Sequence, residues 1–381
     1  MRDTTELHRL IDRVQEAAAS KRNRQRGGKA PHVSVGTEDP IIWTVLFGFD
    51  ARRYFSDPLF YAEQTLRQKL WRFENIADDT RLTLDLPAWL GHYPEYTFLG
   101  IGVDFTERGV PLLQEDHPLT REPDLQLLSP VDFATSGWMP RARQWYEDLV
   151  SLVGDRLQVT FIDWSRGCLD LAIQLRGYQS FLADTRERPQ FVHGLLDFLV
   201  EQRYRWHSER ARYLGEAAPT TTCIADDWIN VPFISPAIFR DFVLPRYLDI
   251  ERLYGAIGGI HSCGNQTPLQ RYLLEIRTLP GLEVSPWTDL AQTLLNVPPE
   301  KTLGISLHPN DVLVATPEEM RARLDFIASS CAGRPYGVGT SGLTPIFDDP
   351  AEFTRRVATW VGIAREVFGH GARPGAACPP P

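Results

Sequence analysis

Short apolar runs alternate with longer amphipathic stretches along most of the chain. Eight of the apolar runs have the length and flanking turn residues of strands, and they cover residues 82–86, 97–103, 158–162, 220–225, 256–260, 282–285, 303–307 and 336–338. Apolar positions at helical spacing lie between many of them, in residues 141–152, 188–214, 235–254, 266–277, 287–295 and 317–331. Alternation of this kind predicts a parallel sheet covered by helices, and eight strands predict an α/β fold that closes into a (β/α)8 TIM barrel.

The two ends of the chain depart from this central pattern. Apolar residues recur at helical spacing over residues 5–20 and 56–76, which predicts two helices ahead of the first predicted strand. The last residues are rich in Gly, Ala and Pro, a composition typical of disorder. We therefore expect an N-terminal helical extension over 1–79, a barrel over 80–368 and a disordered tail over 369–381.

The end of the fifth predicted strand carries the most informative residues. The apolar run ends at Ile260, and His261 and Cys263 follow it two positions apart. Residues two apart on an extended backbone project to the same face, so the imidazole and the thiol converge. Imidazole nitrogen and thiolate sulfur are ligands of zinc, so the pair predicts part of a zinc site, which needs three or four ligands in all. The alternative is an ordinary strand end.

Polar and aromatic side chains follow seven of the predicted strands. In TIM barrels the residues that carry chemistry gather where strands end in their βα loops, so we expect these side chains at the C-terminal mouth of the barrel. An aspartate after a strand is also a common helix cap, so each residue alone has a structural alternative. The candidates are Asp85, Asp163, Trp164, Arg166, Asp226, Asp227, Trp228, His261, Cys263, Asn265, Glu283, Trp287, His308 and Ser341.

Several of these candidates have a more specific expected role. Asp226 and Asp227 point to opposite faces of a strand, and we expect Asp227 in the mouth while its neighbour caps the next helix. Arg166 is expected to bind an acidic group of the substrate through its forked guanidinium, unless it forms a salt bridge that holds its loop. Three tryptophans either wall the pocket or pack in the core, namely Trp164, Trp228 and Trp287.

The motif His261-Ser262-Cys263-Gly264-Asn265 resembles the His-x-Cys-Gly-Asn signature of the uroporphyrinogen decarboxylase superfamily. Within it, the chain is similar to the zinc-dependent branch that contains the methylcobalamin:coenzyme M methyltransferases. Further motifs follow the family order, and the resemblance covers about residues 80–368. They are an Arg-Gly helix at 175–184, Asp226-Asp227-Trp228, a Ser-Pro-x-x-Phe helix at 235–245 and a Gly-Thr-Ser-Gly-Leu-Thr-Pro turn at 339–345.

The resemblance implies an enzyme that transfers a methyl or alkyl group to or from a small thiol, with zinc at the C-terminal mouth of the barrel. The implied methyl donor is a corrinoid that arrives free or on a partner protein, because no corrinoid-binding domain is visible in the chain. Together with the strand-end positions, the resemblance assigns catalysis to Asp163, Asp227 and His308. It assigns metal binding to His261, Cys263, Asp227 and Glu283. The expected substrate-binding residues are Asp85, Trp164, Arg166, Trp228, Asn265, Trp287 and Ser341.

One metal ligand of the family is missing from this chain. The methyltransferase branch has a cysteine in the last turn, where this chain has Thr340 and Ser341 between two glycines. A neutral hydroxyl is a poor zinc ligand compared with thiolate, imidazole or carboxylate. Either this branch has lost the metal, or another strand end supplies the third ligand, from Asp227, Glu283, His308 or Cys168.

Two other functions remain open from the sequence. The founding enzymes of the superfamily decarboxylate a pyrrole substrate without a cofactor, and Asp85 would here stabilise the pyrrole nitrogens. The arginine-rich signature of those enzymes is not evident near Asp85, so a carboxy-lyase ranks second. A non-catalytic ligand-binding barrel ranks third, and the missing cysteine is its main support.

Composition and charge narrow the class of protein. A net charge of −9 lacks the basic footprint of a nucleic-acid-binding protein. No apolar run reaches the length of a membrane helix, and the N-terminus lacks the apolar core of a signal peptide. Five cysteines at wide, irregular spacing favour reduced thiols over a disulfide framework. We therefore expect a cytoplasmic protein with a small-molecule substrate, and with Cys223 and Cys331 in its core.

Overall fold

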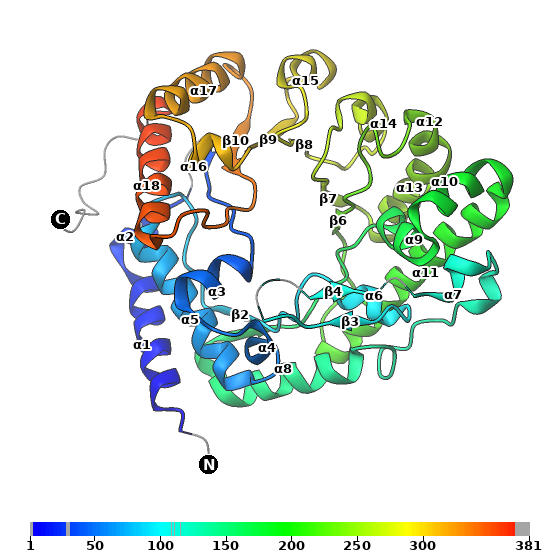
Figure 1. Ribbon diagram of the computed structural model, residues 1–381, viewed down its shortest axis with the longest axis horizontal. Helices are drawn as coiled ribbons and strands as arrows, with labels where there is room; N and C mark the ends of the chain where they lie inside the picture. Colours follow the sequence, from blue (N-terminus) through cyan, green and yellow to red (C-terminus); the bar gives the residue numbers. More distant parts are fainter. Residues whose placement is uncertain (1–2, 28–30, 108, 110, 115, 370–381) are drawn as a thin grey trace.

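Short parallel strands arranged around a common centre form the inner layer of the fold (Figure 1). The computed structural model describes residues 3–27, 31–107, 109, 111–114 and 116–369. The largest piece of sheet has the order β1-β10-β9-β8, and smaller pieces pair β6 with β7 and β2 with β5, all in parallel. The bounds are β1 His32–Val33, β2 Asp85–Pro87, β5 Gln158–Thr160, β6 Thr222–Ala225, β7 Ile257–His261, β8 Gly281–Val284, β9 Thr302–Leu307 and β10 Tyr336–Thr340.

Helices follow the strands along the chain and cover the outside of the ring (Figure 1). The N-terminal third contains α1 Thr5–Ala19, α2 Lys21–Arg24, α3 Ile41–Phe47, α4 Ala51–Tyr54, α5 Pro58–Asn75, α6 Pro94–Phe98, α7 Pro118–Arg121 and η1 Leu125–Leu127. The middle contains α8 Met139–Val153, η2 Gly154–Arg156, α9 Cys168–Arg176, α10 Tyr178–Glu187, α11 Pro189–Leu214, α12 Pro236–Ile238, the π-helix η3 Phe239–Val243 and α13 Leu244–Tyr254. The last part contains η4 Thr267–Leu269, α14 Gln270–Leu273, α15 Leu290–Asn296, α16 Asn310–Leu313, α17 Pro317–Ser330 and α18 Pro350–Val367.

Local sequence signals set where several of these helices begin and end. Thr316 and Glu319 form a capping box at the start of α17, so two backbone N–H groups of the first turn are satisfied. Asp57 caps α5 ahead of Pro58, whose fixed backbone angle suits the first turn of a helix. Gly215 ends α11 in the left-handed conformation, at φ 68°, which only glycine adopts at little cost.

The N-terminal region is continuous with the barrel. The helices predicted over 5–20 and 56–76 are present as α1 and α5, and they pack against each other. Between them, β1 pairs in parallel with β10, so the sheet includes residues that the sequence assigns to the extension. The boundary expected at residue 80 therefore does not separate two structural units, because the sheet crosses it.

The strand predicted over residues 97–103 is wrong. That region contains the end of α6 and then an antiparallel hairpin of β3, Val103–Asp104, with β4, Leu112–Leu113. Pro94 suits the first turn of a helix, and the glycines at 100 and 102 interrupt an extended run. The parallel strand missing from the prediction is β1, which is too short to show an alternating pattern. The other seven predicted strands overlap strands of the structure.

An apolar layer between the strands and the outer helices holds the barrel together. Trp164, Trp206 and Trp360 are among its largest fully buried side chains. The four apolar residues on one face of α1 are also buried, where this helix contacts α5. Burial of this apolar area is the main source of stability for a fold of this size.

Two further expectations concern the ends and the environment of the chain. Apart from Gly369, the tail predicted to be disordered lies outside the described residues. Within the described part of the chain, every helix is too short or too polar to cross a membrane.

Candidate metal and substrate site

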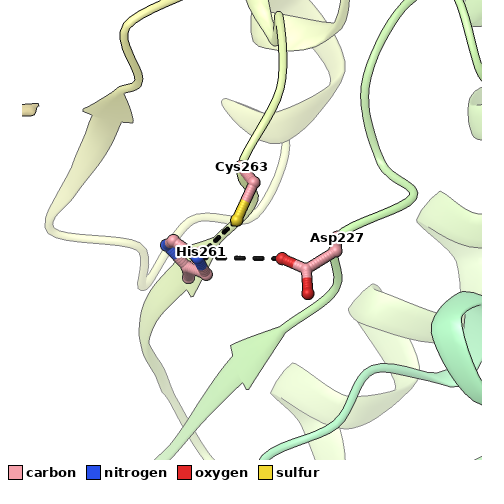
Figure 2. Close-up of side chains that lie close together, drawn as sticks. All are labelled: Asp227, His261 and Cys263. Atoms are coloured by element: carbon pink, nitrogen blue, oxygen red, sulfur yellow. Dashed lines mark hydrogen bonds and ion pairs between the residues drawn. The ribbon is translucent and has the colours of Figure 1, made fainter. Parts of the chain in front are cut away.

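The ends of β6 and β7 bring together the residues of the candidate site. Ala225 lies opposite His261 in this parallel pair, and the Asp226 N–H donates to the His261 carbonyl at 2.9 Å. Asp227 therefore leaves β6 at the edge of the sheet where His261 ends β7, and Cys263 follows two residues later. Figure 2 shows the three side chains pointing toward one another. This convergence is what the strand-end rule for barrels predicts.

Three different donor atoms face one another in this group. Cys263 Sγ lies 3.3 Å from His261 Nε2, and Asp227 Oδ1 lies 3.7 Å from the same nitrogen. The three donor atoms all lie within 4.8 Å of one another. Asp227 Oδ1 is buried and has no hydrogen-bond partner among the described residues, which is costly for a carboxylate oxygen. A cation would satisfy it, and imidazole, thiolate and carboxylate are the ligand types of zinc.

Glu283, on β8, holds the opposite side of the imidazole. Its Oε2 lies 2.7 Å from His261 Nδ1, so it accepts the proton of that nitrogen. With the proton on Nδ1, the lone pair of Nε2 faces Cys263 and Asp227, as in metal sites where a carboxylate orients the histidine ligand. Glu283 thus lies behind the histidine and outside the group of three converging donors. The sequence, in contrast, predicts Glu283 as a direct metal ligand.

Negative charge collects around His261. The hydrogen bonds to the Cys263 sulfur and the Glu283 carboxylate raise the pKa of His261 to about 10, against the opposing effect of burial. The site therefore stabilises a positive charge on the ring, and the same electric field favours a bound cation. A metal ion at Nε2 has to displace the proton there, so metal and proton compete for this atom.

Arg166 fixes the second oxygen of Asp227. Its Nη1 donates to Asp227 Oδ2 at 2.9 Å and to Asp170 Oδ2 at 2.9 Å. Burial alone would raise the pKa of Asp227, but the charge of Arg166 helps to outweigh burial and the pKa is lowered. Arg166 thus forms salt bridges with two carboxylates, as in the alternative given by the sequence, and its acid-binding role stays a prediction.

Two adjoining cavities open on these residues. The larger has a volume of about 680 Å³ and the second about 530 Å³. They share four lining residues, which are Tyr93, Arg166, Asp227 and Cys263. The donor group therefore lies where the two cavities meet, and a small molecule in either can approach it.

Four of the side chains that the sequence places at the barrel mouth line the second cavity together, namely Asp163, Asp227, His261 and Cys263. Asp163 Oδ1 lies 2.9 Å from His207 Nε2. Burial alone would raise the pKa of Asp163, but His207 and nearby arginines lower it to about 2. Three further candidates line the larger cavity, which are Trp228, Asn265 and Trp287.

Asp85 and Trp164 do not line either cavity. β2 begins at Asp85, so this residue lies at the end of the strand away from the mouth, where it pairs with Lys69 at 3.0 Å. The predicted strand ended near Asp85 because its apolar run begins three residues earlier. Trp164 is fully buried and packs against Phe98 and Trp206, so it belongs to the core.

His308 and Ser341 also lie outside the lining of both cavities. The ring of His308 packs edge-on against Trp287, with centroids 5.8 Å apart, and its Nδ1 accepts from the Asn310 N–H. Ser341 Oγ lies 3.3 Å from Ser306 Oγ. Within the described residues, neither contributes to the group of three donors.

The described cysteines outside the donor group are Cys168, Cys223 and Cys331, and they divide into core and surface. Cys168 is buried at the start of α9, where burial raises the pKa of its thiol, so it is a core residue and no ligand. Cys331 is buried, as expected. Cys223 is exposed, contrary to expectation, because Gly258 and Gly259 beside it on β7 have no side chain to cover it.

The side chains of Asp226 and Asp227 lie in different surroundings, the first in the interior and the second in the cavities, as the alternation of a strand predicts. Asp226 is fully buried, and its Oδ2 accepts from Tyr247 Oη at 2.9 Å and from the Leu169 N–H at 3.1 Å. The buried aspartate therefore accepts from the first turn of α9, and it does not cap the helix that follows it, where Ser235 is the cap, contrary to expectation.

The sequence pattern does not predict several residues around the site. Glu38 lines the second cavity from the loop after β1, and burial together with the charge of Asp227 raises its pKa. Tyr93, Tyr96 and Asp170 line the larger cavity. Glu38 follows a strand, so the strand-end rule would have included it had β1 been recognisable. Tyr93 and Tyr96 lie just before residues 97–103, which the sequence wrongly predicts as a strand.

The fold and the donor group define a TIM-barrel protein with its candidate site at the C-terminal mouth. The uroporphyrinogen decarboxylase (URO-D) family model matches residues 94–341, which include all three donors, and the chain belongs to this family. A methyltransferase from Methanosarcina mazei has a similar structure, with a TM-score of 0.63 and 17% identity over 94% of this chain and 99% of that one. No curated protein matches the sequence. The family and the barrel expected from the sequence are confirmed.

Proposed function

We propose that this protein binds zinc through His261, Cys263 and Asp227 and transfers a methyl or alkyl group to or from a small thiol. The observation that carries the proposal is the convergence of three donor atoms, one of them a buried carboxylate oxygen without a hydrogen-bond partner among the described residues. The methyl donor is a corrinoid that arrives free or on a partner protein, or another methylated compound. The similarity of fold to a methyltransferase supports the reaction class.

The donor set fits zinc without the cysteine of the last turn. Asp227 takes the place of that cysteine as an anionic ligand, so the set has one thiolate, one carboxylate and one neutral imidazole. When bound, zinc supplies a Lewis acid that lowers the pKa of an incoming thiol, so that a thiolate forms at neutral pH. With three protein ligands, a bound zinc would keep a position open for that thiol.

The surrounding residues hold the donors in place. Glu283 keeps the proton on Nδ1 of His261, so that Nε2 faces the metal position. Arg166 binds Asp227 Oδ2 and leaves Oδ1 directed at His261. The thiol and the methyl donor approach through the two cavities that meet at Cys263.

A decarboxylase of the founding type is less well supported. That chemistry needs an aspartate in the cleft and arginines for several substrate carboxylates. Asp85 pairs with Lys69 away from both cavities, and Arg166 is shared by two carboxylates. A non-catalytic binding barrel would leave the convergence of three donor atoms without a purpose.

Mass spectrometry of a small thiol incubated with zinc-loaded protein and methylcobalamin tests the reaction. We expect the methyl thioether to accumulate with wild-type protein and to be lost with Cys263→Ser or after zinc is removed by a chelator. Formation of the thioether at an unchanged rate in chelator would contradict the zinc-dependent reaction. The exposed Cys223 provides the matched control, because Cys223→Ser leaves the donor group intact.

A further inference from the structure

We infer that the methylated substrate of the larger cavity carries a positive charge, as a quaternary ammonium or sulfonium group. This inference rests on the proposed function, because it specifies the methylated compound that the proposal allows as methyl donor in place of a corrinoid. It is drawn from the charges and the aromatic side chains that line the two adjoining cavities.

Carboxylates outnumber cationic side chains around the two cavities. Among the described lining residues, Arg166 carries a guanidinium, the metal-free His261 carries an imidazolium because its pKa is raised to about 10, and none carries an ammonium group. Five carboxyl groups line the same space, those of Glu38, Glu95, Asp163, Asp170 and Asp227. Arg166 is already hydrogen-bonded to two of them, so its charge is compensated before any ligand enters. Carboxyl groups thus outnumber cationic groups around the two cavities, which favours a cationic ligand over an anionic one.

Aromatic side chains form much of the wall of the larger cavity. They are Tyr93, Tyr96, Trp228, Phe233 and Trp287. Trp287 is 56% exposed and Phe233 is 46% exposed, which is unusual for large apolar side chains and leaves their surfaces open to a ligand. Tyr178 stacks on Trp228 at 4.9 Å between ring centroids and holds that ring in place. Aromatic faces bind methylated onium groups through cation–π attraction and apolar contact with the methyl groups.

An uncharged aromatic methyl ether fits the apolar walls but makes no use of the carboxylates. An onium group uses both, because its charge is spread over methyl groups that pack on rings while nearby carboxylates attract it. Asp227 lies at the junction of the cavities and next to Cys263, so the positive end of the ligand is drawn toward the donor group. The aromatic walls and the carboxylates together therefore favour an onium ligand over an uncharged methyl ether.

The chemistry of an onium matches methyl transfer to a thiol. The bond between nitrogen and the methyl carbon breaks with both electrons remaining on nitrogen, and the methyl carbon forms a bond with the thiolate sulfur. The products are a neutral tertiary amine and a thioether, and the proton of the thiol has left for solvent before the transfer. The step needs no oxidant or reductant, and the positive charge of the donor disappears as the negative charge of the thiolate does.

Calorimetric titration of the full-length protein with a matched pair of ligands tests the inference. Choline and 3,3-dimethyl-1-butanol have nearly the same shape, but only choline has a charged nitrogen where the alcohol has carbon. We expect choline to bind at least about tenfold more tightly than the alcohol, because charge is the one difference between them. Equal affinities, tighter binding of the alcohol, or no detectable binding of choline at millimolar concentration overturns the inference.

A second pair of ligands tests the sign of the cavity charge. 2-Mercaptoethanol is expected to bind the zinc-loaded protein more tightly than 2-mercaptoethanesulfonate, since the sulfonate adds a negative charge beside the carboxylates. Tighter binding of the sulfonate would overturn the inference.

A pair of exposed aromatic residues provides the matched variants. Trp287→Leu removes a cavity wall, and Phe326→Leu removes an exposed ring on α17, outside both cavities. We expect the first to weaken choline binding roughly three- to fivefold and the second to leave it unchanged. Equal effects of the two variants would show that the ring at 287 does not contact the onium and would overturn its assigned role.

The failure of this inference is distinguishable from the failure of the proposed function. Choline binding is measured in metal-free and in zinc-loaded protein, so it does not depend on activity. A protein that binds zinc and methylates a thiol but prefers the uncharged alcohol disproves the onium alone. A protein that prefers choline but binds no zinc disproves the metal-dependent reaction and leaves the charge preference of the cavity intact.

Discussion

His261 donates from Nδ1 to Glu283 Oε2 at 2.7 Å, on the opposite side of the ring from Cys263. The two contacts fix both the tautomer and the direction of the imidazole. Glu283 therefore acts on a metal through the histidine, because it determines where the Nε2 lone pair points.

Glu283→Gln is expected to weaken zinc binding about 10- to 100-fold without unfolding the protein, the usual effect of removing the partner of a histidine ligand. Competition against a chromophoric chelator measures this affinity. The exposed Glu275 gives a control, and Glu275→Gln should bind zinc as wild type does. If Glu283→Gln also matches wild type, the residue does not orient His261 for metal.

Zinc affinity should rise with pH across the range below about 10. The pKa of His261 in the metal-free protein is raised to about 10 by Cys263 and Glu283, so a proton occupies the ring at neutral pH and has to leave before metal binds. Titrations in buffers of different ionisation enthalpy measure the released proton. Binding that is independent of pH between 6 and 9 would contradict the assignment of Nε2 as a ligand.

The stability of the metal-free protein should fall as pH rises, whereas its zinc affinity rises. A folded-state pKa above the ordinary value of 6.5 stabilises the fold fully below pH 6.5, and this contribution is lost as pH rises toward about 10. Thermal unfolding in chelator is expected to show a lower Tm at pH 9.5 than at pH 6.5. The difference should shrink in His261→Gln, and an undiminished difference would assign it to other groups.

Arg166→Met should destabilise the protein by roughly 3–5 kcal/mol, because it leaves the buried Asp170 without its cationic partner. Denaturant unfolding measures the change. Arg321→Met breaks the exposed pair with Glu366 and is expected to cost less than about 1 kcal/mol. Similar losses of stability in the two variants would mean that the salt bridges of Arg166 do not hold the loop after β5.

Asp227→Asn is expected to weaken zinc binding strongly, because it replaces an anionic oxygen by a neutral one. Asp163→Asn is the matched control, since Asp163 lines the same cavity but binds His207 and is not one of the three converging donors. The same chelator competition compares the two. Equal zinc affinities would place Asp227 outside the metal ligands.

The barrel and the centre of the site were predictable because they depend on regular patterns. Strand–helix alternation located seven of the strands, and the two-residue spacing of His261 and Cys263 put both side chains on one face. Asp227 was expected in the mouth because neighbouring residues of a strand point to opposite faces. These features follow from local backbone geometry, which the sequence carries directly.

The residues that were misplaced depend on exact strand ends and on neighbours distant in sequence. Asp85 was assigned to the end of a strand that in fact begins there. Glu38 was missed because β1 has two residues and no readable alternation. Glu283 lies on the expected strand, but its role depends on which nitrogen of His261 it contacts. Such relationships appear only when the pairing of β7 with its neighbours is known.

Metal content is the most direct test of the account. Wild-type protein, purified without chelator and analysed by inductively coupled plasma mass spectrometry, is expected to contain about one zinc ion per chain. Cys263→Ser should contain little zinc and still fold, while Cys223→Ser, which removes an exposed thiol outside the donor group, should keep the wild-type content. Wild-type protein that carries no zinc and takes up none in calorimetry would contradict the central claim.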